Sequence, residues 1–173
     1  TDADEARLLR ELWKALEPYD VVAAWYGEGF DFVVVHARTK ARRLLVNVRR
    51  WRWLDQLEVY KSLNAHVAES GDEKQSMSLQ AVATALLGDG KKEFDAGNTW
   101  EAWSAGGESR ARLMEYNEHD VALQVGIERK TQYIKLFSTL CAACRLFVET
   151  HSLHASTQMD DYMLRLGKLR GHH

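Results

Sequence analysis

Residues 20–31 read Asp20-Val-Val-Ala-Ala-Trp-Tyr-Gly-Glu-Gly-Phe-Asp31, and this stretch decides the expected fold. Its first half is a short apolar run bounded by turn-forming residues, which is typical of a buried strand. A glycine-rich turn follows, and the segment 30–40 is expected to be a helix, although its valine run favours a strand by propensity. Such a strand and turn would present Asp31 at the carboxyl edge of an α/β sheet. The alternative is that Asp31 only caps the helix.

The rest of the chain mixes helical and strand patterns, which predicts an α/β fold. Amphipathic or capped helices are expected at 4–16, 79–87, 99–103, 109–147 and 160–169, and a second strand at 44–48. The segment 109–147 has the strongest helical periodicity, and Gly126 within it is a candidate bend. No internal repeat and no linker divides the chain.

The composition is that of an ordinary globular protein. The chain has 173 residues, of which 46% are hydrophobic, and a formal net charge of −2, which argues against a disordered tail or a histone-like binder. No apolar run approaches the roughly 20 residues of a membrane span, and the acidic N-terminus does not resemble a signal peptide. Cys141 and Cys144 are interpreted as reduced thiols in core packing. We therefore expect a cytoplasmic protein without a membrane partner.

The segment Tyr116-Asn-Glu-His-Asp120 places a phenol and a carboxylate four residues apart on a predicted helix. Residues at this spacing share one helix face, so both groups can point into one site. Metal-assisted phosphodiester hydrolysis needs clustered carboxylates for two Mg²⁺-type ions, roughly 3.5–4 Å apart, and a group that orients the attacking water. The alternative is a solvated helix face with a partly buried tyrosine.

A basic stretch, 38–53, contains seven Arg and Lys residues with Trp51 and Trp53 between them. Guanidinium groups can neutralise phosphates and indoles can stack on unpaired bases, which favours nucleic-acid binding. The equally weighted alternative is that the tryptophans pack in the core while the arginines extend outward.

Taken in order, these pieces resemble the proofreading 3′→5′ exonuclease of family B DNA polymerases, the tyrosine subclass of the DEDD nucleases. The stretch 20–31 resembles the second exonuclease motif of that family, and Tyr116-Asn-Glu-His-Asp120 matches its third, Tyr-x-x-x-Asp. Between them, Trp53-Leu-Asp-Gln-Leu-Glu-Val-Tyr-Lys61 and Ser78-Leu-Gln-Ala-Val-Ala-Thr-Ala-Leu-Leu-Gly88 are similar to the family's intervening elements. The likeness covers roughly residues 4 to 150.

The resemblance implies a helix-rich, ribonuclease H-like α/β fold that lacks the opening strands. It implies an exonuclease-like domain at 1–150 and a tail at 151–173 that leads towards a polymerase palm. Asp31 and Asp120 would hold a Mg²⁺ or Mn²⁺ pair, and Tyr116 would position the water that attacks the end of a single-stranded DNA. The resemblance and the basic stretch together predict that the following residues contact nucleic acid: Tyr26, Phe30, Arg49, Arg50, Trp51 and Arg52.

Two departures from the family pattern bear on activity. Tyr26 stands where the family usually has a DNA-contacting asparagine, and the first motif, an Asp-x-Glu on an opening strand, is missing. Two of four carboxylates should bind paired cations poorly and slow hydrolysis by orders of magnitude. The alternative function is therefore a non-catalytic DNA-binding or partner-binding module. The expected partners are a polymerase domain, an N-terminal segment supplied separately, or a second copy paired through an open sheet edge.

Overall fold

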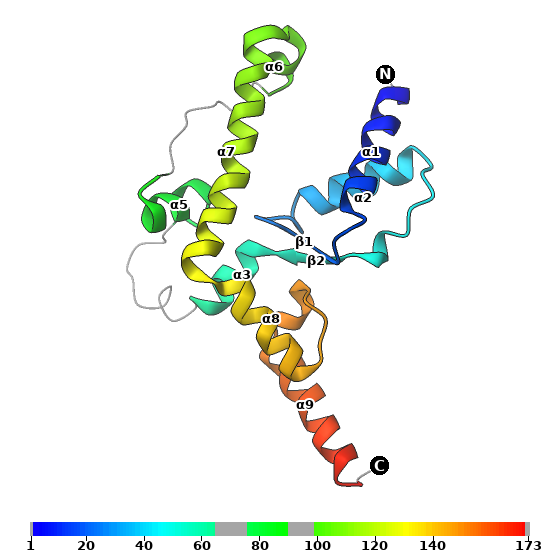
Figure 1. Cartoon of the computed structure of the whole chain (residues 1–173), viewed down its shortest axis with the longest axis vertical. Helices are drawn as coiled ribbons and strands as arrows, with labels where there is room; N and C mark the ends of the chain where they lie inside the picture. The colour runs from blue at the N-terminus through cyan, green and yellow to red at the C-terminus, as the bar shows by residue number, and fades with distance from the viewer. Residues whose placement is uncertain (1, 65–75, 90–98, 172–173) are drawn as a thin grey trace. The chain divides into compact units, whose positions relative to one another are not determined.

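A computed structural model describes residues 2–64, 76–89 and 99–171 (Figure 1). The chain forms two compact units, one made of Thr1–Glu69 and Tyr133–His173 and the other of Ser70–Gln132. The elements of the first unit are α1 (Asp2–Leu16), β1 (Val21–Ala24), α2 (Asp31–Ala41), η1 (Val48–Arg50), β2 (Arg52–Asp55), α3 (Gln56–Leu63), α8 (Tyr133–Cys144), η3 (Thr150–Leu153) and α9 (Ala155–Leu169). Those of the second are α5 (Leu79–Leu87), α6 (Thr99–Ala105) and α7 (Gly107–Thr131).

In the first unit, β1 and β2 form a parallel pair joined by the helix α2. Ala24, the last residue of β1, lies opposite Asp55, the last residue of β2. Consecutive side chains of a strand face opposite sides of the sheet. Accordingly, Val21 packs against one buried cluster and Val22 against another, so apolar residues cover both faces of β1, as its sequence predicted.

The two clusters draw on distant parts of the chain. Leu54 and Val59 pack with Phe137 and Cys141 of α8, whereas the other cluster is made of Leu9, Trp13 and Trp51. The Trp13 indole nitrogen donates a hydrogen bond of 3.0 Å to the Thr39 hydroxyl, which ties α1 to α2 inside the core. A buried indole N–H that finds an acceptor avoids the cost of an unsatisfied donor.

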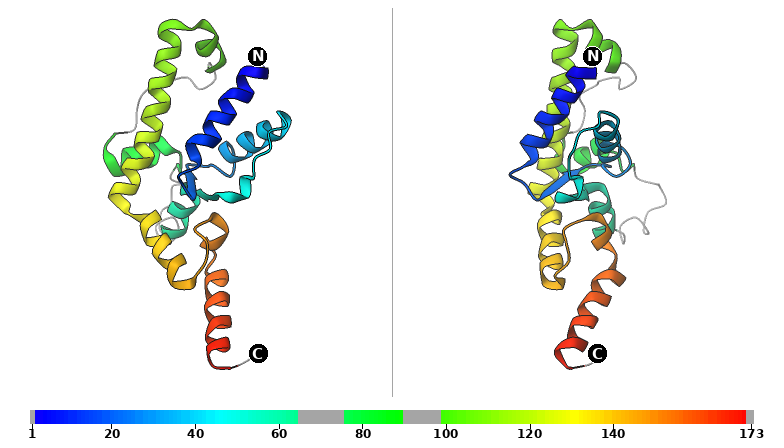
Figure 2. Two further views of the ribbon diagram at one scale, coloured as in Figure 1. Left: turned by 45° about the vertical axis from the view of Figure 1, so that its right-hand side comes forward. Right: turned by 90° about the vertical axis from the view of Figure 1, so that its right-hand side faces the viewer.

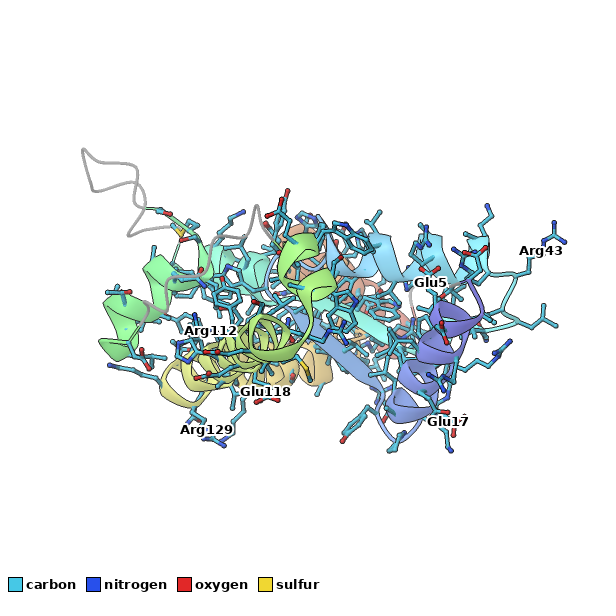
Figure 3. All side chains as sticks on the ribbon, turned by 90° about the horizontal axis from the view of Figure 1, so that it is seen from above. Glu5, Glu17, Arg43, Arg112, Glu118 and Arg129 are labelled. Carbon is cyan, nitrogen blue, oxygen red and sulfur yellow. The ribbon has the colours of Figure 1, made fainter. Side chains whose placement is uncertain are left out.

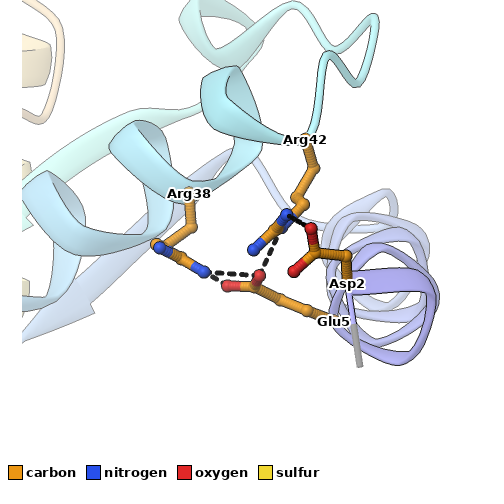
Figure 4. A network of polar contacts seen from close by, with 4 residues as sticks. All are labelled: Asp2, Glu5, Arg38 and Arg42. Carbon is orange, nitrogen blue, oxygen red and sulfur yellow. Dashed lines mark hydrogen bonds and ion pairs between the residues drawn. The ribbon is translucent and has the colours of Figure 1, made fainter.

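Charged side chains also join α1 to α2 at the surface (Figure 4). The Glu5 carboxylate accepts hydrogen bonds from the guanidinium groups of Arg38 and Arg42, and Arg42 pairs with Asp2 at 2.6 Å. The hydrogen bond from Arg38, together with the other charge contacts, lowers the pKa of Glu5 to about 2. Two arginines of the predicted basic stretch are therefore engaged within the protein.

In the second unit, α5 and α6 each pack against α7, as the views in Figures 1 and 2 agree. The Ser78 hydroxyl accepts a hydrogen bond from the Ala81 N–H and so caps α5, and Gly88, at φ 73°, ends it. Both roles follow from the sequence, since serine satisfies free N–H groups and glycine adopts positive φ without strain.

The structure confirms most expected helices and the first strand, and it corrects two predictions. The segment 44–48 is not a strand. Its alternating apolar side chains, Leu44, Val46 and Val48, pack on the Trp13 cluster without a strand partner, and the second strand is 52–55 instead. The long helical segment is not continuous: α7 runs through Gly126 and ends at Gln132, which adopts φ 54° and donates its N–H to the Glu128 carbonyl.

None of the described helices is both long enough and apolar enough to span a membrane. The predicted division at residue 150 stays a prediction, and the compact units divide elsewhere.

Candidate active site

The turn after β1 is held by the carboxylate of Asp55, which is 1% exposed. The backbone N–H of Tyr26 donates to Asp55 Oδ1 and that of Glu28 to Oδ2, each at 3.1 Å. Oδ1 also accepts from the Leu57 N–H at 3.0 Å, which caps α3. One carboxylate therefore fixes both the turn after β1 and the start of the helix after β2.

Aromatic rings pack directly over the two glycines of the turn. A Cβ added at Gly27 would lie 2.5 Å from the Phe32 ring, and one added at Gly29 would lie 2.2 Å from the Tyr26 ring. Tyr26 has φ 60°, a left-handed conformation that asparagine adopts more readily than tyrosine. Because its ring lies close over Gly29, the aromatic side chain at this position is part of the turn's packing.

Asp31 follows this turn as the first residue of α2 and is exposed to solvent. The N-cap position belongs to Phe30, which makes no side-chain cap, so Asp31 is not the N-cap residue. Desolvation by the surrounding protein raises the pKa of the Asp31 carboxyl, and the negative charge of Asp55 raises it further. The first unit thus presents the exposed Asp31 carboxylate beside the carboxyl end of the strand pair.

Tyr116 and Asp120 lie on α7 in the second unit and are brought together by a third residue, Gln80 of α5. The Gln80 amide nitrogen donates to Asp120 Oδ1 at 2.8 Å and to the Tyr116 hydroxyl at 3.2 Å. A hydrogen bond also joins the Tyr116 hydroxyl to the Asp120 carboxylate. The phenol and the carboxylate therefore share one polar network, as their spacing predicted.

Partial burial shapes the acid–base properties of this network. Desolvation raises the pKa of Tyr116, and the charge of Asp120 raises it further. Desolvation also raises the pKa of Asp120, whereas the hydrogen bonds from Tyr116 and Gln80 and the charge of His119 oppose that rise. The phenol therefore stays protonated at neutral pH, and it acts by hydrogen bonding rather than as a base.

Sequence reasoning missed Gln80 as a functional residue. It lies in the quoted stretch 78–88, two residues after the capping Ser78, and carries no charge that would single it out. A weak signal exists: a polar side chain in the first turn of an otherwise apolar helix is expected to meet a polar partner.

The residues predicted to contact nucleic acid differ in burial and in the partners they have within the protein. Trp51 is 4% exposed and its indole N–H donates to the Leu16 carbonyl at 2.8 Å, so its position fits the core-packing alternative rather than base stacking. The Arg50 guanidinium donates to the carbonyls of Tyr19 and Glu17, and Arg52 lies over the Phe147 ring and pairs with Glu149. Tyr26, Phe30 and Arg49 are exposed.

The donor chemistry suits hard divalent cations, because carboxylate oxygens are the ligands that Mg²⁺ and Mn²⁺ prefer. The number of donors is smaller than a metal pair requires. Within the described ranges, no group of three or more His, Cys, Asp or Glu residues is placed to hold an ion. Asp31 belongs to the first unit and Asp120 to the second.

One known protein family matches most of this chain. A family model described as the RNase_H superfamily matches residues 1–131. The chain belongs to the RNase H superfamily. The matched part includes Asp31, Gln80, Tyr116 and Asp120, together with the strand pair and α7. Neither the curated proteins nor the solved structures gave a significant match. Membership of the RNase H superfamily agrees with the predicted ribonuclease H-like class, and the narrower polymerase exonuclease subclass remains a proposal.

Proposed function

We propose that this RNase H superfamily chain is a metal-dependent 3′→5′ exonuclease of the kind that proofreads for family B DNA polymerases. It would hydrolyse phosphodiesters at the ends of single-stranded DNA. The observation that carries the proposal is the network in which Gln80 holds the Tyr116 hydroxyl and the Asp120 carboxylate together. This network places a water-orienting group directly beside a cation-binding group, which hydrolysis of this class requires.

Each residue has a separate role in this proposal. Asp31 and Asp120 would hold divalent cations through their carboxylate oxygens. A bound Mg²⁺ or Mn²⁺ ion supplies an activated water and neutralises phosphate charge. Tyr116 would orient the attacking water as a neutral hydrogen-bonding group, because the pKa of its phenol is raised. Phe30 and Tyr26, both exposed in the turn region, would contact the substrate.

The test is degradation of a 3′-labelled single-stranded DNA in Mg²⁺ or Mn²⁺, comparing wild type with Asp120→Asn and Tyr116→Phe. We expect Asp120→Asn to lower the rate by about 100-fold or more, and Tyr116→Phe by about 10- to 100-fold. The control is Glu118→Gln, which changes an exposed carboxylate on the same helix (Figure 3). Equal rates for all four proteins would remove this site from catalysis.

A non-catalytic binding module is the second candidate. The observation that favours it is that three backbone N–H groups engage Asp55, so this carboxylate serves the fold rather than a cation. Fluorescence anisotropy of a labelled single strand in EDTA separates the two functions. Binding in EDTA without cleavage in Mg²⁺ or Mn²⁺ would favour the module, whereas cleavage abolished by Asp120→Asn would exclude it.

A further inference from the structure

The side-chain amide of Gln80 is the part of the network that neither the sequence motifs nor the family match assigns. We propose that Gln80 is a positioning residue whose amide holds the Tyr116 hydroxyl and the Asp120 carboxylate in one arrangement and so orients the phenol for the attacking water. The catalytic role of Gln80 rests on the proposed nuclease function, but its hydrogen bonds can be tested in the absence of any nuclease activity.

The geometry determines which way the amide points. Gln80 Nε2 carries two hydrogens and lies 2.8 Å from Asp120 Oδ1 and 3.2 Å from the Tyr116 hydroxyl, so it can donate one to each. In the reversed orientation, the amide oxygen would face the Asp120 carboxylate. Two acceptors at that distance repel each other, so an ionised Asp120 selects the orientation in which the nitrogen points towards it.

The two hydrogen bonds hold both α7 groups to one partner. The Tyr116 oxygen and the Asp120 carboxylate accept from the same amide, so the phenol has fewer orientations open to it than a phenol on a free helix face. In the proposed reaction, this limits the directions from which the phenol can contact the attacking water.

The backbone of α5 holds Gln80 in place from both sides. Ser78 caps the helix immediately before it, and Leu79, Val82 and Ala83 are buried. At the far end of α5, the end of the Leu87 side chain packs over Gly126, where an added Cβ would lie 2.8 Å from it. The Gln80 side chain therefore reaches the two α7 residues from an anchored helix.

The first experiment records the side-chain amide signals of Gln80 by ¹⁵N NMR in the metal-free protein, assigned by their loss in Gln80→Ala. We expect both amide protons to be shifted by hydrogen bonding, with Tyr116→Phe and Asp120→Asn each changing a different one. Glu118→Gln should leave both signals in place. Amide signals that do not respond to Tyr116→Phe or Asp120→Asn would overturn the inference.

The second experiment measures kcat and KM on single-stranded DNA. We expect Gln80→Ala to lower kcat by about 10- to 100-fold, typical of a residue that orients a catalytic group, and to change KM by less than about twofold. Gln80→Glu has the same size but lacks the amide donors, so it should lose at least as much activity. A lower kcat in Gln80→Ala that Gln80→Glu restored would overturn the inference, since size alone would then suffice.

The outcomes separate this inference from the proposed function. If wild type does not cleave DNA, the proposed function fails, and the amide signals still decide whether Gln80 bonds both the Tyr116 hydroxyl and the Asp120 carboxylate. If cleavage depends on Asp120 but Gln80→Ala keeps wild-type kcat, the nuclease assignment stands and the positioning role of Gln80 is overturned.

Discussion

Two acidic side chains of this protein, Asp55 and Asp120, have opposite kinds of partners. Asp55 is buried and accepts hydrogen bonds from backbone N–H groups of three different residues. Asp120 is half-buried and meets two side chains, those of Gln80 and Tyr116. Backbone donors belong to the fold and cannot move without it, whereas side-chain donors can rotate to admit a ligand. The comparison indicates that Asp55 maintains structure and that Asp120 is available for chemistry.

The largest expected effect separates these two aspartates by stability. Asp55→Ala leaves three backbone N–H groups, one buried and two partly buried, without their acceptor, and we expect it to lower the free energy of unfolding by about 3–5 kcal/mol. Asp120→Asn keeps an oxygen that can accept from Gln80, and it should change stability by less than about 1 kcal/mol. Urea unfolding followed by circular dichroism measures both.

Asp55→Asn sharpens this comparison, because it retains one acceptor oxygen of the same size and should fall between wild type and Asp55→Ala. A stable, fully folded Asp55→Ala protein would refute the structural role of this carboxylate.

The next effect compares two glycines, one in each unit. A Cβ at Gly27 would meet the Phe32 ring, which is buried and has little room to move, so Gly27→Ala should cost about 1–3 kcal/mol. A Cβ at Gly126 would meet the mobile end of Leu87, and the higher helix propensity of alanine, about 1 kcal/mol, offsets the contact. We therefore expect Gly126→Ala to be close to neutral. Thermal unfolding of both variants checks this, and equal losses would contradict it.

A smaller effect depends on pH. The pKa of Glu5 is about 2 in the folded protein, below its ordinary value of 4.5, so its ion pairs stabilise the fold above about pH 4.5. This contribution is lost progressively as the pH falls towards 2. Glu5→Gln should lower Tm at pH 6, and its difference from wild type should shrink below about pH 4.5 and close only below about pH 2. Glu11→Gln, which changes an exposed carboxylate on the same helix, is the matched control.

The smallest effect concerns the two thiols of α8. Cys141 is completely buried, and desolvation raises its pKa to about 11, whereas Cys144 is partly exposed. Because the thiolate is the reactive form, we expect a thiol reagent at pH 8 to label Cys144 well before Cys141 in the native protein. Mass spectrometry of partially labelled protein measures the order, and faster labelling of Cys141 would contradict the packing of this core.

Local patterns predicted the elements whose cause is local. The apolar run ending in a glycine turn predicted β1 and its turn, the Ser78 and Gly88 signals predicted α5, and the four-residue spacing predicted that Tyr116 and Asp120 share a network. The family likeness of the chain was also recognisable at the level of the RNase H superfamily.

Features that depend on long-range packing were not predictable in this way. The alternating residues of 44–48 have the pattern of a strand, but they pack on a tryptophan cluster supplied by α1. Gln132 ends α7 with a positive φ, and the sequence does not signal this helix end because the residue there is not a glycine. Gln80 has no recognisable motif, because its role arises only when α5 lies against α7.

The order in which the parts of the first unit are synthesised follows from its discontinuous sequence. Residues 70–132 form the second unit, and the segments before and after them share one core. Leu54 and Val59 leave the ribosome about eighty residues or more ahead of Phe137 and Cys141, the side chains that complete their burial. During translation, β2 and α3 therefore keep apolar surface exposed until the inserted unit and α8 have been made. In this interval the nascent chain is most exposed to chaperone binding and to aggregation.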